Sequence, residues 1–185
     1  MTKRRSLPGD PSHKDIDIAP MIRVNHAGEY GARRIYQGQL AVLGKDSETR
    51  ALLEHMAEQE DVHLAYFENQ IADRHIRPTI FQPLWHVAGY ALGYATAKMG
   101  RRAAMACTVA VESVISEHYQ EQLDQLETQN NEKDLRESIA KFKAEEEEHH
   151  DIGLDNEAEL TRGYSILTDV IKAGSKLAIA TAKRF

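Results

Sequence analysis

The sequence predicts an all-α protein: a four-helix bundle built from two helical hairpins, with an extra uncharged amphipathic helix between them and one more helix at the C-terminus. Apolar residues recur at spacings of three and four along most of the 185 residues, which is the period of an amphipathic helix. The alternation typical of a half-buried strand is absent from the sequence. Three of the five prolines lie in the first 20 residues, and the others, Pro78 and Pro83, share one interruption. Long helices are therefore expected on both sides of it.

Besides the uncharged segment, five helices follow from the apolar pattern and from residues that favour helix ends. Gly44 and Gly153 are expected to end the first and the last bundle helix, because glycine readily adopts the left-handed conformation that follows a helix. Asp46 or Ser47 is expected to cap the second helix through its short polar side chain. The polar stretch QNNEKD separates the helices of the second hairpin. The expected helices cover residues 21–43, 47–73, 102–128, 132–152 and 164–183.

Composition indicates one globular domain, residues 21–185, preceded by a flexible arm over residues 1–20 that carries prolines and mixed charge. The net charge of -6 disfavours nucleic acid as a partner, because phosphate binding needs a basic surface. The single cysteine, Cys107, excludes an intramolecular disulfide and a Cys-rich zinc site. A metal site in this chain must therefore use histidine and carboxylate ligands.

The segment 78–97 contains no Asp, Glu, Lys or Arg. A length near twenty residues suggests a transmembrane helix, but Gln82, His86 and two glycines make the segment too polar for one. We expect either a core helix or, over residues 78–99, a helix that lies in a membrane interface. Gly89 and Gly93, four residues apart, match a motif for close helix packing.

One hairpin pattern occurs twice in the chain. The strings EYGARRIYQGQL, from Glu29, and ESVISEHYQEQL, from Glu112, share the pattern Glu-x6-Tyr-Gln-x-Gln-Leu. Each is followed in the next expected helix by Glu-x-x-His, first at residues 60–63 and then at residues 146–149. Residues three apart lie on one face of a helix, so Glu-x-x-His can offer two ligands to one ion.

These residues continue the apolar rows of their helices, whereas the overlapping pair Glu147 and His150 falls on a wetter row. Four carboxylates and two imidazoles are thus expected to face one core. Uncompensated carboxylates there would cost several kcal/mol each, so the pattern indicates two divalent metal ions. The candidate ligands are Glu29, Glu60, His63, Glu112, Glu146 and His149.

This ligand set is typical of ferritin-like di-iron or di-manganese carboxylate bundles, in which two helices give one Glu each and two give Glu-x-x-His. Oxygen and imidazole ligands suit iron or manganese, and the lack of thiolates disfavours an iron–sulfur cluster. The residues alone leave three functions open: an oxygen-activating enzyme, an iron-binding or iron-storage protein, and a peroxide-reducing di-metal enzyme. The iron-binding protein and the peroxide-reducing enzyme would use the same ligands, but neither function explains the uncharged segment.

Four further strings narrow this choice. From residue 22 to the C-terminus, the sequence contains IRVNHAGEYGA, PLWHVAGYALG, AMACTVAVES and EEEHHDIGLD in that order. They resemble the demethoxyubiquinone hydroxylase family of ubiquinone biosynthesis. The motifs of that family carry their metal ligands at the same six residues. The resemblance implies two iron ions and hydroxylation of a demethoxyubiquinol ring (2-polyprenyl-3-methyl-6-methoxy-1,4-benzoquinol) by dioxygen.

The resemblance also implies a setting for this reaction. Electrons would come from NADH or from reduced quinone. Residues 78–99 would associate with the membrane or with the quinone. The protein would be a peripheral protein on the cytoplasmic face of a bacterial plasma membrane or the matrix face of the mitochondrial inner membrane, where it would work with a lipid-presenting partner on a polyprenyl quinone. A homo-oligomer is left open, because no feature of the sequence fixes an interface.

Several residues near the expected ligands receive hypothetical roles. Tyr119 and His118 could relay electrons or protons between quinone and metals, although Tyr119 could equally pack and hydrogen-bond in the core. His150 and Asp151 follow His149 and are expected to orient it, because a ligating histidine usually donates its second ring proton to a neighbour. His26, three residues before Glu29, is likewise expected to lie next to the metal ligands. Solvated surface is the alternative for these three residues.

Overall fold

The computed structural model describes residues 17–127, 129 and 131–185. Within these residues the chain is helical and contains no strand, which confirms the predicted all-α class. The expected arm over residues 1–20 lies mostly outside the described residues. The elements are α1 (Ala19–Leu43), α2 (Ser47–Asp73), α3 (Gln82–Lys98), α4 (Arg101–Leu126), α5 (Lys133–Asp155), a short 3-10 helix η1 (Ala158–Leu160) and α6 (Tyr164–Arg184).

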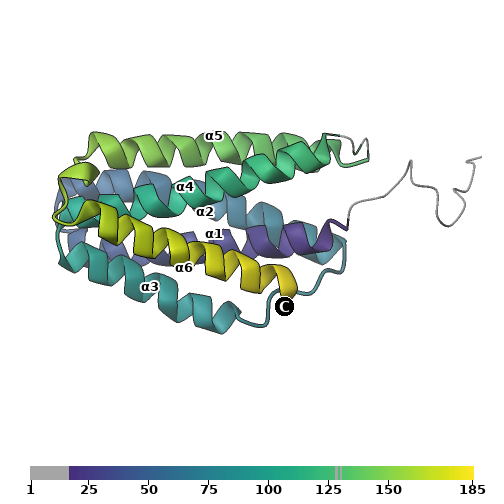
Figure 1. Cartoon of the computed structure of the whole chain (residues 1–185), viewed down its shortest axis with the longest axis horizontal. Coiled ribbons are helices and arrows are strands. Elements are labelled where there is room, and N and C mark those ends of the chain that lie inside the picture. Colours follow the sequence, from purple (N-terminus) through teal and green to yellow (C-terminus); the bar gives the residue numbers. More distant parts are fainter. Residues whose placement is uncertain (1–16, 128, 130) are drawn as a thin grey trace, which may run out of the picture.

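The helices α1, α2, α4 and α5 form a four-helix bundle (Figure 1). α1 packs on α2 and α4 packs on α5, so the two predicted hairpins are present. α6 lies against α4 and α1, and α3 lies against α1, so both additional helices cover the outside of the same bundle. This is a ferritin-like helical bundle with its polar ligands inside.

The predicted faces of the bundle helices are confirmed. In α5 the buried residues are the six of the predicted row, which runs Leu135, Ile139, Phe142, Glu146, His149 and Gly153. In α2 the polar pair Glu60 and His63 lies between Met56 and Phe67, all four of them buried. Apolar clusters around Met56 and around Phe67 therefore close the two ends of the polar centre.

Several helix ends differ from the prediction by one to three residues, and two of these differences have a structural cause. α1 begins at Ala19, two residues early, because Pro20 occupies its first turn, where the missing amide hydrogen costs nothing. α5 does not end at Gly153 but continues to Asp155. A Cβ at Gly153 would lie 2.6 Å from a Val109 side-chain carbon, so this glycine lets α5 approach α4 closely. At α2 the predicted cap is confirmed, since the Asp46 side chain accepts a hydrogen bond from the Thr49 amide.

The uncharged segment is not a core helix. Of the 17 residues of α3, only Gly93, Thr96 and Ala97 are buried. Gly93 lies directly on α1, because a Cβ there would come within 2.0 Å of the Ile35 carbonyl oxygen. A Cβ at Gly89 would similarly meet the backbone of α1. The small-residue motif therefore seats α3 on α1, and the rest of α3 faces outward. Among the described residues, none of the helices combines the length and the apolar character needed to cross a bilayer.

Candidate metal centre

The bundle brings the six predicted side chains together. Each of them is at most 1% exposed. They form two groups of four that share Glu60 and Glu146, and within each group one ligand atom per residue lies within 4.8 Å of the others. We call these groups position A and position B. Position A is Glu29, Glu60, His63 and Glu146; position B is Glu60, Glu112, Glu146 and His149.

The ligating edges of the two histidines face these carboxylates. His63 Nδ1 lies 3.1 Å from an oxygen of Glu146 and 3.4 Å from one of Glu29. His149 Nδ1 lies 3.3 Å from an oxygen of Glu60 and 3.3 Å from one of Glu146. Both imidazoles therefore face Glu146, and each faces one further carboxylate, which is Glu29 for His63 and Glu60 for His149.

Two tyrosines hold the single glutamates from the opposite hairpin. The Tyr36 hydroxyl of α1 donates to Glu112 of α4 at 2.7 Å, and the Tyr119 hydroxyl of α4 donates to Glu29 of α1. Each tyrosine is seven residues after the glutamate of its own repeat. The Glu-x6-Tyr repeat thus gives two reciprocal hydrogen bonds between the hairpins, which are related by approximate two-fold symmetry. We call these two hydrogen bonds the tyrosine clasps. A role was predicted from the sequence for Tyr119 but not for Tyr36, although the repeat contains both.

Burial sets the charges of the centre. It raises the pKa of Glu60 and of Glu112 well above the ordinary range, and the neighbouring Glu146 raises both further. Burial also disfavours the charged forms of Glu146 and His63, but their contacts with groups of opposite charge outweigh it. The pKa of Glu146 falls to about 2, through His149 and His63, and that of His63 rises to about 12, through Glu146 and Glu29. Without a cation the centre therefore holds protons in place of metals.

The donor set fits divalent metal ions. Both carboxylate oxygens of Glu60 and of Glu146, and Nδ1 of His63 and of His149, are buried and have no hydrogen-bond partner. One oxygen of Glu29 and one of Glu112 are in the same condition. Buried polar atoms are nearly always paired, so such a cluster requires an explanation, and bound cations satisfy all of them at once. Oxygen and imidazole donors without thiolates suit iron or manganese.

The outer nitrogens of the two histidines have partners that the sequence analysis missed. His63 Nε2 lies 2.7 Å from a carboxylate oxygen of Glu145, and His149 Nε2 lies 2.8 Å from the amide oxygen of Gln59. The signal was present in the sequence, because each partner directly precedes the glutamate of the other Glu-x-x-His pair.

We expected His150 or Asp151 to contact His149, but the residue that contacts His149 Nε2 is Gln59. His150 and Asp151 contact each other at 3.2 Å on a more exposed face of α5. They do not share the inner face of His149, because residues that follow one another in a helix point in different directions.

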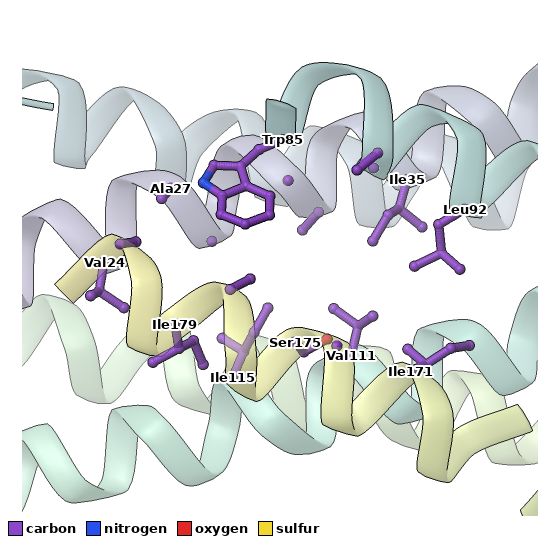
Figure 2. A pocket seen from close by; sticks show the side chains of 18 of the residues that line it. Val24, Ala27, Ile35, Trp85, Leu92, Val111, Ile115, Ile171, Ser175 and Ile179 are labelled. Carbon is purple, nitrogen blue, oxygen red and sulfur yellow. The ribbon is translucent and has the colours of Figure 1, made fainter. Parts of the chain in front are cut away.

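An apolar cavity of about 410 Å³ lies between α1, α3, α4 and α6 (Figure 2). Its wall includes Gly28 and Val111, which are the chain neighbours of Glu29 and Glu112. The cavity therefore adjoins the two helices that carry the single glutamates. Its larger side chains come from all four helices: Ile35, Trp85, Leu92, Val111, Ile115 and Ile171.

Comparison with known proteins agrees with this arrangement. A sequence model of the family described as ubiquinone biosynthesis protein COQ7 matches residues 17–182, a range that contains all six candidate ligands. The chain belongs to this family. COQ7-family relatives include a Rhodospirillum rubrum protein named 3-demethoxyubiquinol 3-hydroxylase, 51% identical over 183 residues, which are 99% of this chain and 85% of the relative.

Eukaryotic COQ7 relatives are also similar. A human protein named NADPH-dependent 3-demethoxyubiquinone 3-hydroxylase, mitochondrial, is 49% identical over 166 residues, covering 89% of this chain and 76% of the relative. A Saccharomyces cerevisiae protein named 5-demethoxyubiquinone hydroxylase, mitochondrial, is 36% identical, with the same two coverages. The human name specifies NADPH, whereas the sequence analysis expected NADH or reduced quinone.

The remaining candidates of this COQ7-family chain are His118 and His26. His118 is 15% exposed, its Nδ1 lies 3.5 Å from Glu121, and burial lowers its pKa. His26 is buried with Nδ1 unpaired, and burial lowers its pKa as well. Within the part of the chain that the structure describes, neither histidine has a hydrogen bond to a candidate ligand. Their predicted roles stay predictions.

Proposed function

We propose that this chain is a di-iron monooxygenase that hydroxylates the ring of demethoxyubiquinol with dioxygen, in a late step of ubiquinone biosynthesis. The observation that carries the proposal is the buried centre of four glutamates and two histidines, in a chain of the COQ7 family. The bacterial relative is named as a hydroxylase of demethoxyubiquinol, and the human and yeast relatives are named as hydroxylases of demethoxyubiquinone.

The six residues of positions A and B would hold two iron ions. Reduced iron supplies the chemistry that protein side chains lack, namely the reductive activation of dioxygen, with one oxygen atom going to the ring and the other to water. The chain's own residues provide the dry surroundings: Tyr36 and Tyr119 orient two of the carboxylates, and the apolar clusters on both sides exclude water. The electrons must come from outside, from NADH, NADPH or reduced quinone.

The apolar cavity would receive the quinone ring and the first part of its polyprenyl tail. It is bounded by aliphatic side chains and Trp85, which suits an isoprenoid chain better than a soluble substrate. Its wall includes Ala32 and Ile115, which are three residues after Glu29 and Glu112 and so lie near them on the same helices. This position would bring a ring toward the two glutamates. Neither iron storage nor peroxide reduction needs such a cavity, so it favours the hydroxylase over both rivals.

Exposed apolar side chains on the two outer helices would rest on a membrane. Leu84 and Val87 of α3 are 53% and 64% exposed, and Val170 and Leu177 of α6 are 66% and 69% exposed. These two helices also bound the cavity, so a tail could pass from the bilayer into it without crossing water. We propose peripheral membrane binding, and a lipid-presenting partner would be a further aid to substrate entry.

We propose further that Tyr119, with His118 beside it, relays electrons or protons between quinone and metals. The hydrogen bond from Tyr119 to Glu29 supports this role, but the same bond would serve a packing role. Tyr36→Phe is a matched comparison, because Tyr36 makes the equivalent bond to Glu112. A relay predicts that Tyr119→Phe loses most turnover at full iron content while Tyr36→Phe loses little. Undiminished turnover of Tyr119→Phe would reject the relay.

Anaerobic purification with metal counting and mass spectrometry of bound lipid tests the main proposal. We expect about two iron ions per chain and a co-purified demethoxyquinone. The variant with Glu60 and Glu146 both changed to Ala should keep the lipid and lose the iron, because these residues belong to both positions. A wild-type protein that takes up no iron would contradict the proposal.

A further inference from the structure

The two metal positions have different outer partners. His63 of position A contacts Glu145, a carboxylate, at 2.7 Å, whereas His149 of position B contacts Gln59, a neutral amide, at 2.8 Å. Both contacts use Nε2, which leaves Nδ1 facing the centre. The outer partner of one position therefore carries a negative charge that the other lacks.

The approximate symmetry of the bundle isolates this difference. Exchange of the two hairpins converts Glu29 into Glu112 and position A into position B. The tyrosine clasps match in the same way. Gln59 and Glu145 are themselves equivalent, since each precedes the glutamate of a Glu-x-x-His pair. At this pair of equivalent sites the chain has an amide on one side and a carboxylate on the other.

A carboxylate behind a ligating imidazole strengthens the imidazole as a metal ligand. It accepts the second ring proton in a charge-assisted hydrogen bond, which places more electron density on the nitrogen that faces the metal. An amide oxygen orients the ring in the same way but contributes less charge. Substitution of such outer partners typically changes metal affinity by about 10–100-fold.

The charge of Glu145 is only weakly offset by its surroundings. Lys141 lies 3.4 Å from its other oxygen, but the lysine side chain is 62% exposed. Exposed ion pairs are screened by water and contribute little. The Glu145 side chain itself is 21% exposed, and its contact with the fully buried His63 is shorter than its contact with Lys141.

We propose that Glu145 and Gln59 make the two metal positions unequal, so that position A binds the first divalent ion more tightly than position B. Glu145 is then a positioning residue that acts through His63. This inference rests on the proposed metal pair, and it adds an order of filling and a cause for that order.

The test uses Mn²⁺, which needs no redox chemistry, with the full-length chain. Crystals grown with one equivalent of Mn²⁺ per chain locate the ion by its anomalous scattering, and equilibrium dialysis gives the affinity. Four proteins are compared: wild type, Glu145→Gln, Gln59→Glu, and the double variant that exchanges the two residues. The exchange keeps the composition and the number of charges, so it controls for a general loss of charge.

In the wild type we expect the ion at position A, with about tenfold or greater preference. Glu145→Gln should weaken binding of the first ion by about 10–100-fold and equalise the two positions. Gln59→Glu should equalise them by strengthening position B, which tests the same idea if Glu145→Gln fails to fold. In the exchanged variant the ion should move to position B.

Equal occupancy of both positions in the wild type would overturn the inference and leave the proposed metal pair intact. An ion that stays at position A in the exchanged variant would overturn it too. If no Mn²⁺ or Fe²⁺ binds to the wild type at all, the proposed function fails and this inference fails with it.

Discussion

Metal binding should release protons, because the metal-free centre holds protons where the metals would bind. Burial raises the pKa of Glu60 and of Glu112 well above the ordinary range, and contacts with carboxylates raise the pKa of His149 and bring that of His63 to about 12, so His63 is protonated at neutral pH. His63 must lose its proton to become a ligand, and Glu60, Glu112 and His149 must lose any that they hold. We therefore expect at least one proton to be released at pH 7 when two ions bind.

The pH dependence follows from this count. Each proton released makes the overall binding constant about tenfold weaker for every unit by which the pH is lowered. The His63 proton alone corresponds to about tenfold per pH unit, or about 1.4 kcal/mol, and protons held by Glu60, Glu112 and His149 would add to it. Calorimetric titration with Mn²⁺ in buffers of different ionisation enthalpy measures the proton number directly. The exposed Glu148→Gln is the control and should release the same number. Affinity that stays constant between pH 6 and 8 would refute the reasoning.

Three further outcomes follow from the structure. The metal-free protein should lose stability as pH rises from about 6 to 8. His63 and Glu60 have raised pKa values in the folded state, so their contribution to stability is present below the unfolded pKa and is lost as pH rises from the unfolded pKa toward the folded pKa. Thermal melting at several pH values checks the sign of this change, and two bound ions should reverse it. Gly93→Ala should cost about 1–3 kcal/mol or more, since its Cβ would overlap α1, whereas Gly174→Ala, with open space around it, should be neutral or stabilising in urea unfolding. Leu84→Asp with Leu177→Asp should reduce flotation with liposomes at least tenfold, while Val62→Asp, equally apolar and exposed on α2, should leave it unchanged.

Much of the centre could be predicted from the sequence, because helix periodicity fixes which residues share a face. Glu146 and His149 lie on the same row as Phe142, and the structure buries all three. The competing Glu147 lies on a different row and is exposed. One-dimensional spacing was enough here, since these relations lie within single helices.

Relations between helices could not be predicted in this way. The contacts of Glu145 with His63 and of Tyr36 with Glu112 depend on how the helices cross and at which level, which spacing within one helix does not determine. The cavity depends on four helices at once. The prediction that α5 ends at Gly153 was wrong for the same reason. The missing side chain of Gly153 lets α5 lie close to α4, and it does not mark a turn at the end of α5.

A single-turnover reaction tests the central claim most directly. The protein is loaded anaerobically with two equivalents of Fe²⁺, mixed with liposomes that contain demethoxyubiquinol, and then exposed to isotopically labelled dioxygen. The account predicts a quinone product that carries one labelled oxygen atom on its ring, and no such product from Glu60→Ala. Protein that binds both irons and consumes the dioxygen, yet leaves the ring unlabelled, would contradict it.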